Sequence, residues 1–165
     1  HSVPCHSMQL ATLCYIFKGD EVLMLYRNKK AQDIHEGKWN GLGGKFEAGE
    51  TPEQCVIREV KEESGLQLID PRLRGILTFP LFAKGRDWYV FLFTANRFEG
   101  ELIESAEGDL QWVKKDELLD LNLWEGDKVF LPYIFKDGFF SGRFIYEHGA
   151  LVSHEMLVHE QFSGP

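Results

Sequence analysis

The residues that could do chemistry are concentrated in one stretch of the chain, residues 43–66. It reads GGKFEAGETPEQCVIREVKEESGL: a glycine pair, an acidic loop and then a helical pattern. Thr51 is a favourable N-cap, Pro52 suits the first helical position, and Gly65 stands where a left-handed C-cap ends a helix. We therefore predict a helix over residues 51–64 that carries several charged groups in its second half.

The acidic side chains of this predicted helix share one flank. At about 100° per residue, Glu59 and Glu63 fall beside the apolar stripe and Glu62 lies one strip further out. Like charges at this spacing repel, and partial burial strengthens the repulsion. The three carboxylates therefore form one of two things. One is a solvated acidic face with Lys61 and Arg58 as counter-charges. The other is a site for Mg²⁺ or Mn²⁺, which prefer oxygen ligands. Because Mg²⁺ keeps waters and bridges to phosphate, the second interpretation predicts a phosphorylated substrate.

The spacing of this stretch also matches the Nudix box. Gly44, five residues, Glu50, seven residues and then residues 58–66 reproduce G-x5-E-x7-R-E-U-x-E-E-x-G-U, in which U is aliphatic. The wider pattern, from Leu10 to about Glu160, resembles the MutT-type oxidised-purine nucleoside triphosphate diphosphatases. The resemblance implies an α/β (α+β) Nudix fold, with a mixed β-sheet sandwiched between helices.

The resemblance further implies roles for individual acidic residues. Glu59, Glu62 and Glu63 match metal ligands of the family, and the carbonyl of Gly43 often joins them. Glu107, on a loop before a predicted strand, matches a residue that ligates metal or acts as a base in relatives; a plain loop carboxylate is the alternative. Glu62, Glu63 or Glu107 would then take a proton from the attacking water. The residues expected to be structural within the motif are Gly44, Glu50, Arg58 and Gly65.

Two basic residues outside the acidic flank are expected to lie near phosphate. Arg27 ends a predicted strand at a position where relatives place a basic residue, and Lys45 follows the glycine pair. For each of them, a solvated surface side chain is the alternative interpretation.

Three further residues are expected to determine which base the protein binds. By the resemblance, Asn40 hydrogen-bonds the purine edge, Trp124 stacks on the ring, and Asp127 reads the remaining edge. The alternatives are a capping role for Asp127 and a core role for Trp124. The best-known relatives carry adjacent acids here, whereas this chain has Gly126 before Asp127, so one reader of the base is missing or replaced. The apolar candidates for the pocket wall are Ile34, Phe79, Phe82 and Trp88.

Together these patterns predict an enzyme. The expected reaction is Mg²⁺-dependent hydrolysis of 8-oxo-dGTP, or a related purine triphosphate, to the monophosphate and pyrophosphate, which sanitises the nucleotide pool for DNA repair. One alternative keeps the chemistry but changes the substrate to dGTP, ADP-ribose or the 5′ end of RNA. Another is a non-catalytic nucleotide-binding module. Such modules typically lose carboxylates from the box, and here all three are present.

Composition restricts the partners and the compartment. The formal net charge of -8 argues against binding to long nucleic acid, which needs a basic surface. Three cysteines without metal-ligand spacing predict small buried thiols in a reducing, cytoplasmic setting. We find no apolar run of membrane-spanning length and no signal-peptide pattern, and the sequence is compatible with both a monomer and a homodimer. Residues 1–7 lack an apolar period and precede Met8, so we expect an added tail there and one domain over residues 8–165.

The remaining segments read as strands with short connections. The predicted strands are 9–17, 21–27, 75–79, 87–98 and 110–113, with a closing hairpin of 143–146 and 151–158. Helical turns are expected over 114–119 and a helix over 125–136.

Overall fold

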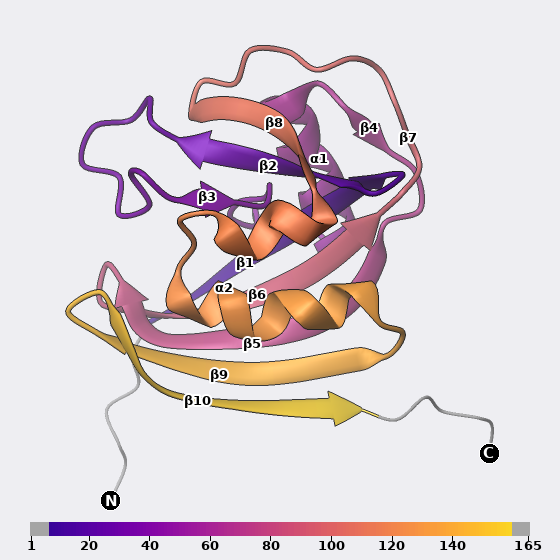
Figure 1. Cartoon of the computed structure of the whole chain (residues 1–165). Coiled ribbons are helices and arrows are strands. Elements are labelled where there is room, and N and C mark those ends of the chain that lie inside the picture. The colour runs from indigo at the N-terminus through magenta and orange to yellow at the C-terminus, as the bar shows by residue number, and fades with distance from the viewer. Residues whose placement is uncertain (1–6, 160–165) are drawn as a thin grey trace, which may run out of the picture.

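A mixed eight-stranded sheet forms the centre of the computed structural model, which describes residues 7–159 (Figure 1). The strands are β1 (Met8–Lys18), β2 (Glu21–Arg27), β3 (Trp39–Asn40), β5 (Arg72–Ala83), β6 (Arg86–Ala95), β8 (Gly108–Lys114), β9 (Phe139–Glu147) and β10 (Ala150–His159). Their order is β10-β9-β5-β6-β1-β2-β3, and β8 pairs with the other edge of β2 along its whole length. The pairs β1–β6 and β5–β9 are parallel and the other pairs are antiparallel. A separate two-stranded sheet joins β4 (Gln67–Leu68) to β7 (Phe98–Glu99).

Helical segments cover both faces of the large sheet, as the sequence predicts. On one face, α1 (Pro52–Ser64) packs Val56 and Val60 onto buried residues of β1, β2 and β6. On the other face, α2 (Glu125–Phe130) and the 3₁₀ helix η2 (Leu131–Phe135) contribute Phe130 and Ile134 to a second core. Another 3₁₀ helix, η1 (Lys115–Asp120), follows β8. No helix within residues 7–159 is long and apolar enough to cross a bilayer.

A split in the sheet positions the glycine-rich loop. β1 and β2 pair only beside their shared turn, and further along residues 42–46 pair with β1 instead. The Thr12 N–H donates to the Gly44 carbonyl at 2.8 Å, and the Phe46 N–H donates to the Leu10 carbonyl at 3.1 Å. A Cβ on Gly43 would lie 2.0 Å from the Thr12 carbonyl oxygen, so only glycine allows this approach. The loop is therefore part of the sheet, and the chain continues from it to the start of α1.

Most predicted elements are present, with differences of extent. The strand predicted over 87–98 ends earlier, because β6 stops at Ala95 and Phe98 belongs to β7. The strands predicted over 75–79 and 143–146 are parts of the longer β5 and β9 (Figure 1). The predicted helix over 125–136 is wrong in its second half, because the chain tightens into η2 at Pro132, which has no N–H to donate to an α-helical bond.

The cysteine prediction is confirmed for the two thiols in the described part of the chain. Cys14 and Cys55 are free and buried. Cys5 lies outside the described residues. So does the expected tail, except for Ser7, whose carbonyl accepts the N–H of Asp87 at 3.0 Å.

Candidate functional site

The helix α1 places its carboxylates through well-defined ends. At its start, the Thr51 hydroxyl accepts the Gln54 N–H at 3.1 Å, and the Gln54 side chain accepts the Thr51 N–H at 3.0 Å. At its end, Gly65 adopts φ 82° and donates its N–H to the Lys61 carbonyl at 2.9 Å. A capping box and a left-handed glycine therefore confine the helix to the predicted residues.

Arg58 lies beside the three carboxylates of α1, Glu59, Glu62 and Glu63, which we call the acidic group. Its guanidinium binds Glu50 through two hydrogen bonds, of 2.7 and 2.8 Å, and Glu59 through a third of 2.8 Å. It also donates to the Lys45 carbonyl at 3.0 Å and lies 3.5 Å from a Glu62 oxygen. Hydrogen bonds from Arg58 lower the pKa of Glu50 to about 2. The arginine thus ties the loop before α1 to the helix and orients Glu59.

Glu63 is the most deeply buried carboxylate of the group, 8 % exposed. Its Oε1 accepts the Gly43 N–H at 2.8 Å, whereas its Oε2 is buried without a hydrogen-bond partner. Burial, followed by the neighbouring charge of Glu107, raises the pKa of Glu63 well above its ordinary value. An orphaned oxygen beside a second carboxylate is costly unless a proton or a cation is shared between them.

Glu107 reaches this group from the loop before β8. Burial raises its pKa, but a hydrogen bond from Lys30 and the charge of Arg27 outweigh that effect and leave the pKa lowered. The Lys30 and Arg27 contacts measure 3.0 and 3.3 Å. Arg27 also binds Asp33 at 2.9 Å, and it is mostly buried, so it is not the solvated strand-end side chain of the alternative interpretation.

These residues fit a hard divalent cation. Their available donors are carboxylate oxygens, one of them buried and unpartnered, and the mutual repulsion of Glu63 and Glu107 would be relieved by positive charge. Within residues 7–159, no three acidic, histidine or cysteine side chains are already gathered as a ligand set. Glu59 is held by Arg58, and Glu62 is largely exposed. The helix therefore presents carboxylates that would have to converge on a cation.

The close packing of Gly44 against Glu59 yields a prediction. A Cβ on Gly44 would lie 2.4 Å from the Glu59 carboxylate, the flexible end of a side chain, so the fold can adapt while Glu59 is displaced from Arg58. Gly44→Ala should lower kcat at least about tenfold with little change in the midpoint of thermal unfolding. Gly49→Ala is the control. It has open space but φ 80°, and should cost about 1 kcal/mol of stability without loss of kcat. Full activity of Gly44→Ala would show that the position of Glu59 does not matter.

A second group of predicted residues lies on the other face of the sheet, around the start of α2. Trp124 is 8 % exposed and Asp127 is 7 % exposed. Burial raises the pKa of Asp127 to about 7, against the opposing charge of Lys38. Asp127 lies in the first turn of α2, after the N-cap residue Trp124, so the structure leaves the favourable interaction with the helix dipole in place. The Asn40 Nδ2, on β3, is buried without a partner.

Trp124 belongs to an aromatic cluster that the sequence predicted only in part. Its indole N–H donates to His35 Nδ1 at 2.8 Å, and its ring packs edge-on against Phe82 and Tyr146 at centroid distances of 5.0 and 5.4 Å. Burial, followed by the charge of Arg27, lowers the pKa of His35 to about 4, which keeps the imidazole neutral as an acceptor. Of the other predicted wall residues, Phe79 contacts Phe82, whereas Ile34 is 48 % exposed.

Tyr146 explains the glycine at position 126. The Gly126 N–H donates to the Tyr146 hydroxyl at 2.6 Å, and a Cβ on Gly126 would lie 2.7 Å from that oxygen. The hydroxyl thus occupies the space that a larger side chain at position 126 would need. No local pattern in the sequence signals this contact, because Tyr146 comes from β9.

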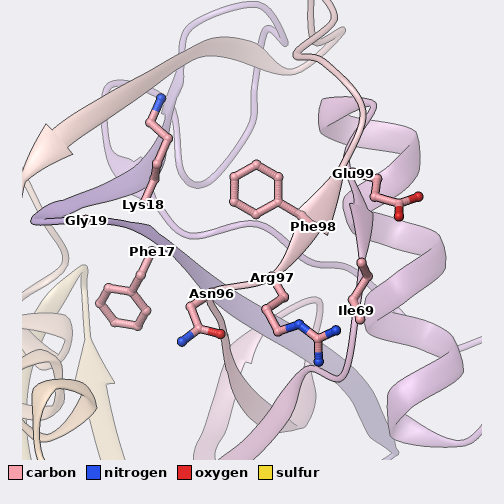
Figure 2. A pocket seen from close by; sticks show the side chains of 8 residues that line it. All are labelled: Phe17, Lys18, Gly19, Ile69, Asn96, Arg97, Phe98 and Glu99. Atoms are coloured by element: carbon pink, nitrogen blue, oxygen red, sulfur yellow. The ribbon is translucent and has the colours of Figure 1, made fainter.

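An open hollow of about 770 Å³ lies elsewhere on the molecule (Figure 2). Lys18 and Gly19 of the first turn and Arg97 and Phe98 near β7 are among the residues that line it. None of the predicted site residues faces it, so we do not assign the chemistry to this hollow.

Comparison with known proteins gives matches over most of the chain. Residues 8–134 match the family model described as NUDIX domain. An uncharacterized Nudix hydrolase, YvcI of Bacillus subtilis, is 34% identical over 84% of this chain and 87% of its own length. An oxidized purine nucleoside triphosphate hydrolase of Danio rerio is 33% identical over 90% of this chain and 94% of its own. The crystal structure of a MutT protein from Bacillus halodurans superposes with a TM-score of 0.79 at 36% identity, covering 90% of this chain and 97% of that one.

Proposed function

Because the chain belongs to the Nudix family of hydrolases and is of the MutT type, we propose that it hydrolyses a purine nucleoside triphosphate. The products would be the nucleoside monophosphate and pyrophosphate, and 8-oxo-dGTP is the favoured substrate. The similarity to proteins named oxidized purine nucleoside triphosphate hydrolase supports this choice. Such a role would sanitise the nucleotide pool.

The observation that carries the proposal is that Asn40 and Asp127 each present a buried polar group. The Asn40 amide is buried without a partner for its N–H₂, and the Asp127 carboxyl is buried with a pKa of about 7. An amide offers a donor and an acceptor, and a carboxyl near its pKa can offer either. The keto and N–H groups of an oxidised guanine need both kinds of partner, so this base would satisfy groups that the protein leaves free.

The acidic group of α1 would then act on the phosphates. We propose that Glu59, Glu62 and Glu63, with the Gly43 carbonyl and Glu107, hold Mg²⁺ or Mn²⁺. When bound, such a cation acidifies water and offsets phosphate charge. Arg58 would keep Glu59 oriented, and Arg27 and Lys45 would face the phosphate oxygens. Either Glu63 or Glu107 would accept the proton of the attacking water, because each places a carboxylate beside the proposed cation.

A substrate panel tests the proposal. The enzyme is incubated with Mg²⁺ and 8-oxo-dGTP, dGTP, ADP-ribose or 5′-capped RNA, and kcat/KM is measured from the products released. We expect the highest value for 8-oxo-dGTP, with pyrophosphate as the second product, and loss of turnover when the cation is chelated. A higher value for ADP-ribose or RNA would overturn the substrate assignment. Lack of turnover with every member would overturn the enzymatic one.

A further inference from the structure

Three cationic side chains lie where the β5–β6 turn approaches the glycine-rich loop, at the ends of strands inside the sheet. We call Lys45, Lys84 and Arg86 the cationic rim. Lys45 lies opposite Ala11 of β1, and its Nζ lies 5.7 Å from the ring centroid of Trp88 on β6. Lys84 belongs to the turn between β5 and β6, and Arg86 begins β6. The rim thus combines a loop residue with two residues from a hairpin about forty positions later in the chain.

The hairpin holds its two charges in a defined position. Ala83 pairs with Arg86, so Lys84 and Gly85 form a two-residue turn, with φ 55° and 64°. Both φ values are positive, as in the type I′ turns that suit a twisted hairpin. The Trp88 indole N–H donates to the Ala83 carbonyl at 3.0 Å, and this bond stabilises the end of β5.

The rim carries positive charge that nearby acids do not neutralise. Within residues 7–159, none of its three members forms an ion pair, and Arg86 binds only the neutral Gln9 amide, at 2.7 Å. Lys45 is next to the hairpin through the Trp88 ring, whose indole N–H binds the Ala83 carbonyl beside Lys84. Like charges placed this close repel, and an anion between them would remove the repulsion.

The rim borders the acidic group directly. The Lys45 carbonyl accepts a hydrogen bond from Arg58 at 3.0 Å, and Arg58 orients Glu59. Gly44, the residue before Lys45, packs against the Glu59 carboxylate. A phosphate chain that starts at the carboxylates and passes Gly44 would therefore reach Lys45 and then the hairpin.

We propose that Lys84 and Arg86, together with Lys45, bind the terminal phosphoryl groups of the substrate, the part that leaves as pyrophosphate. This rests on the proposed function, because it assumes a triphosphate in the site. A triphosphate places its highest negative charge at its free end, and guanidinium and ammonium groups are the matching donors. The rim would thus make the protein prefer triphosphates to diphosphates of the same nucleoside.

The experiment compares the double variant Lys84→Ala/Arg86→Ala with the wild type in two measurements. The first is the affinity for inorganic pyrophosphate in metal-free buffer, by calorimetry or by Trp88 fluorescence. The second is kcat/KM for one nucleoside as its triphosphate and as its diphosphate. We expect about tenfold or greater weakening of pyrophosphate binding. We also expect a similar loss of kcat/KM for the triphosphate, with little change for the diphosphate.

Two single variants and a control complete the design. Lys84 is exposed, so Lys84→Ala alone keeps the test open if the double variant fails to fold. Lys115→Ala removes an exposed charge from η1 and should leave both measurements unchanged. Unchanged pyrophosphate affinity in both Lys84→Ala and Arg86→Ala would overturn the proposal. If wild-type protein binds pyrophosphate through the rim but turns over no nucleotide, the proposed function fails and the anion site stands.

Discussion

Glu62→Gln is expected to lower kcat by on the order of 10³-fold in the presence of saturating Mg²⁺. The substitution keeps the size of the side chain but removes the negative charge proposed to hold the cation. The Glu62 side chain is 59% exposed and lies 3.5 Å from Arg58, so it contributes little to the fold. The midpoint of thermal unfolding should therefore stay close to the wild-type value while the apparent Mg²⁺ requirement rises. Steady-state kinetics across a Mg²⁺ titration, together with a thermal melt, measures both.

Glu53→Gln is the matched control for this substitution. Glu53 lies on the same helix, in its first turn, and is exposed. Its replacement should leave kcat and the Mg²⁺ requirement unchanged. Near-wild-type turnover in Glu62→Gln would remove this residue from the catalytic group.

Asp127→Asn is expected to change the ratio of kcat/KM for 8-oxo-dGTP to that for dGTP by about 10- to 100-fold. An amide cannot switch between donor and acceptor as a carboxyl with a pKa of about 7 can. The Mg²⁺ requirement should not change, because Asp127 is not among the residues proposed to hold the cation. Kinetics with the two nucleotides checks the ratio. An unchanged ratio with lower stability would reduce Asp127 to a structural role.

The same variant should alter how stability depends on pH. The folded pKa of Asp127, about 7, lies above its ordinary value of 3.8, so its contribution to stability is fully present below about pH 4 and is lost as the pH rises through about 7. The charged and titratable groups that influence it or are influenced by it are Lys38, Tyr15 and Tyr146. Asp127→Asn should therefore gain stability relative to wild type as the pH rises from about 4 to about 7, and keep that gain at higher pH, in paired thermal melts. Glu125→Gln, an exposed neighbour in α2, should show no such gain.

The sequence predicts the part of the site that lies within a single segment, the helix α1 and its carboxylates. The caps of α1 and the arrangement of Glu59, Glu62 and Glu63 follow from helical spacing and end signals within one segment, so the sequence contains all the information needed. The same spacing predicts that Glu59 and Glu63 lie at the edge of the apolar stripe, but it does not predict that Glu63 is the more deeply buried of the two.

Contacts between distant segments could not be predicted in the same way. The Trp124–His35 bond joins positions 89 residues apart, and Tyr146 meets Gly126 across 20 residues and a change from helix to strand. No spacing rule relates such positions, because the packing of strands and helices determines them. The same holds for Lys84 and Arg86, which approach Lys45 only after β1, β5 and β6 have assembled.

The contact between Tyr146 and Gly126 brings a residue from outside the family match beside the proposed base site. The match to the family ends at residue 134, and it includes every acidic residue of the proposed cation site. Tyr146 comes later, in the hairpin that closes the edge of the sheet. Mutations in that hairpin could therefore reshape the surroundings of the base while the hydrolytic helix stays untouched. The base site proposed around Asn40, Trp124 and Asp127 thus depends on a residue outside the family match as well as on residues within it.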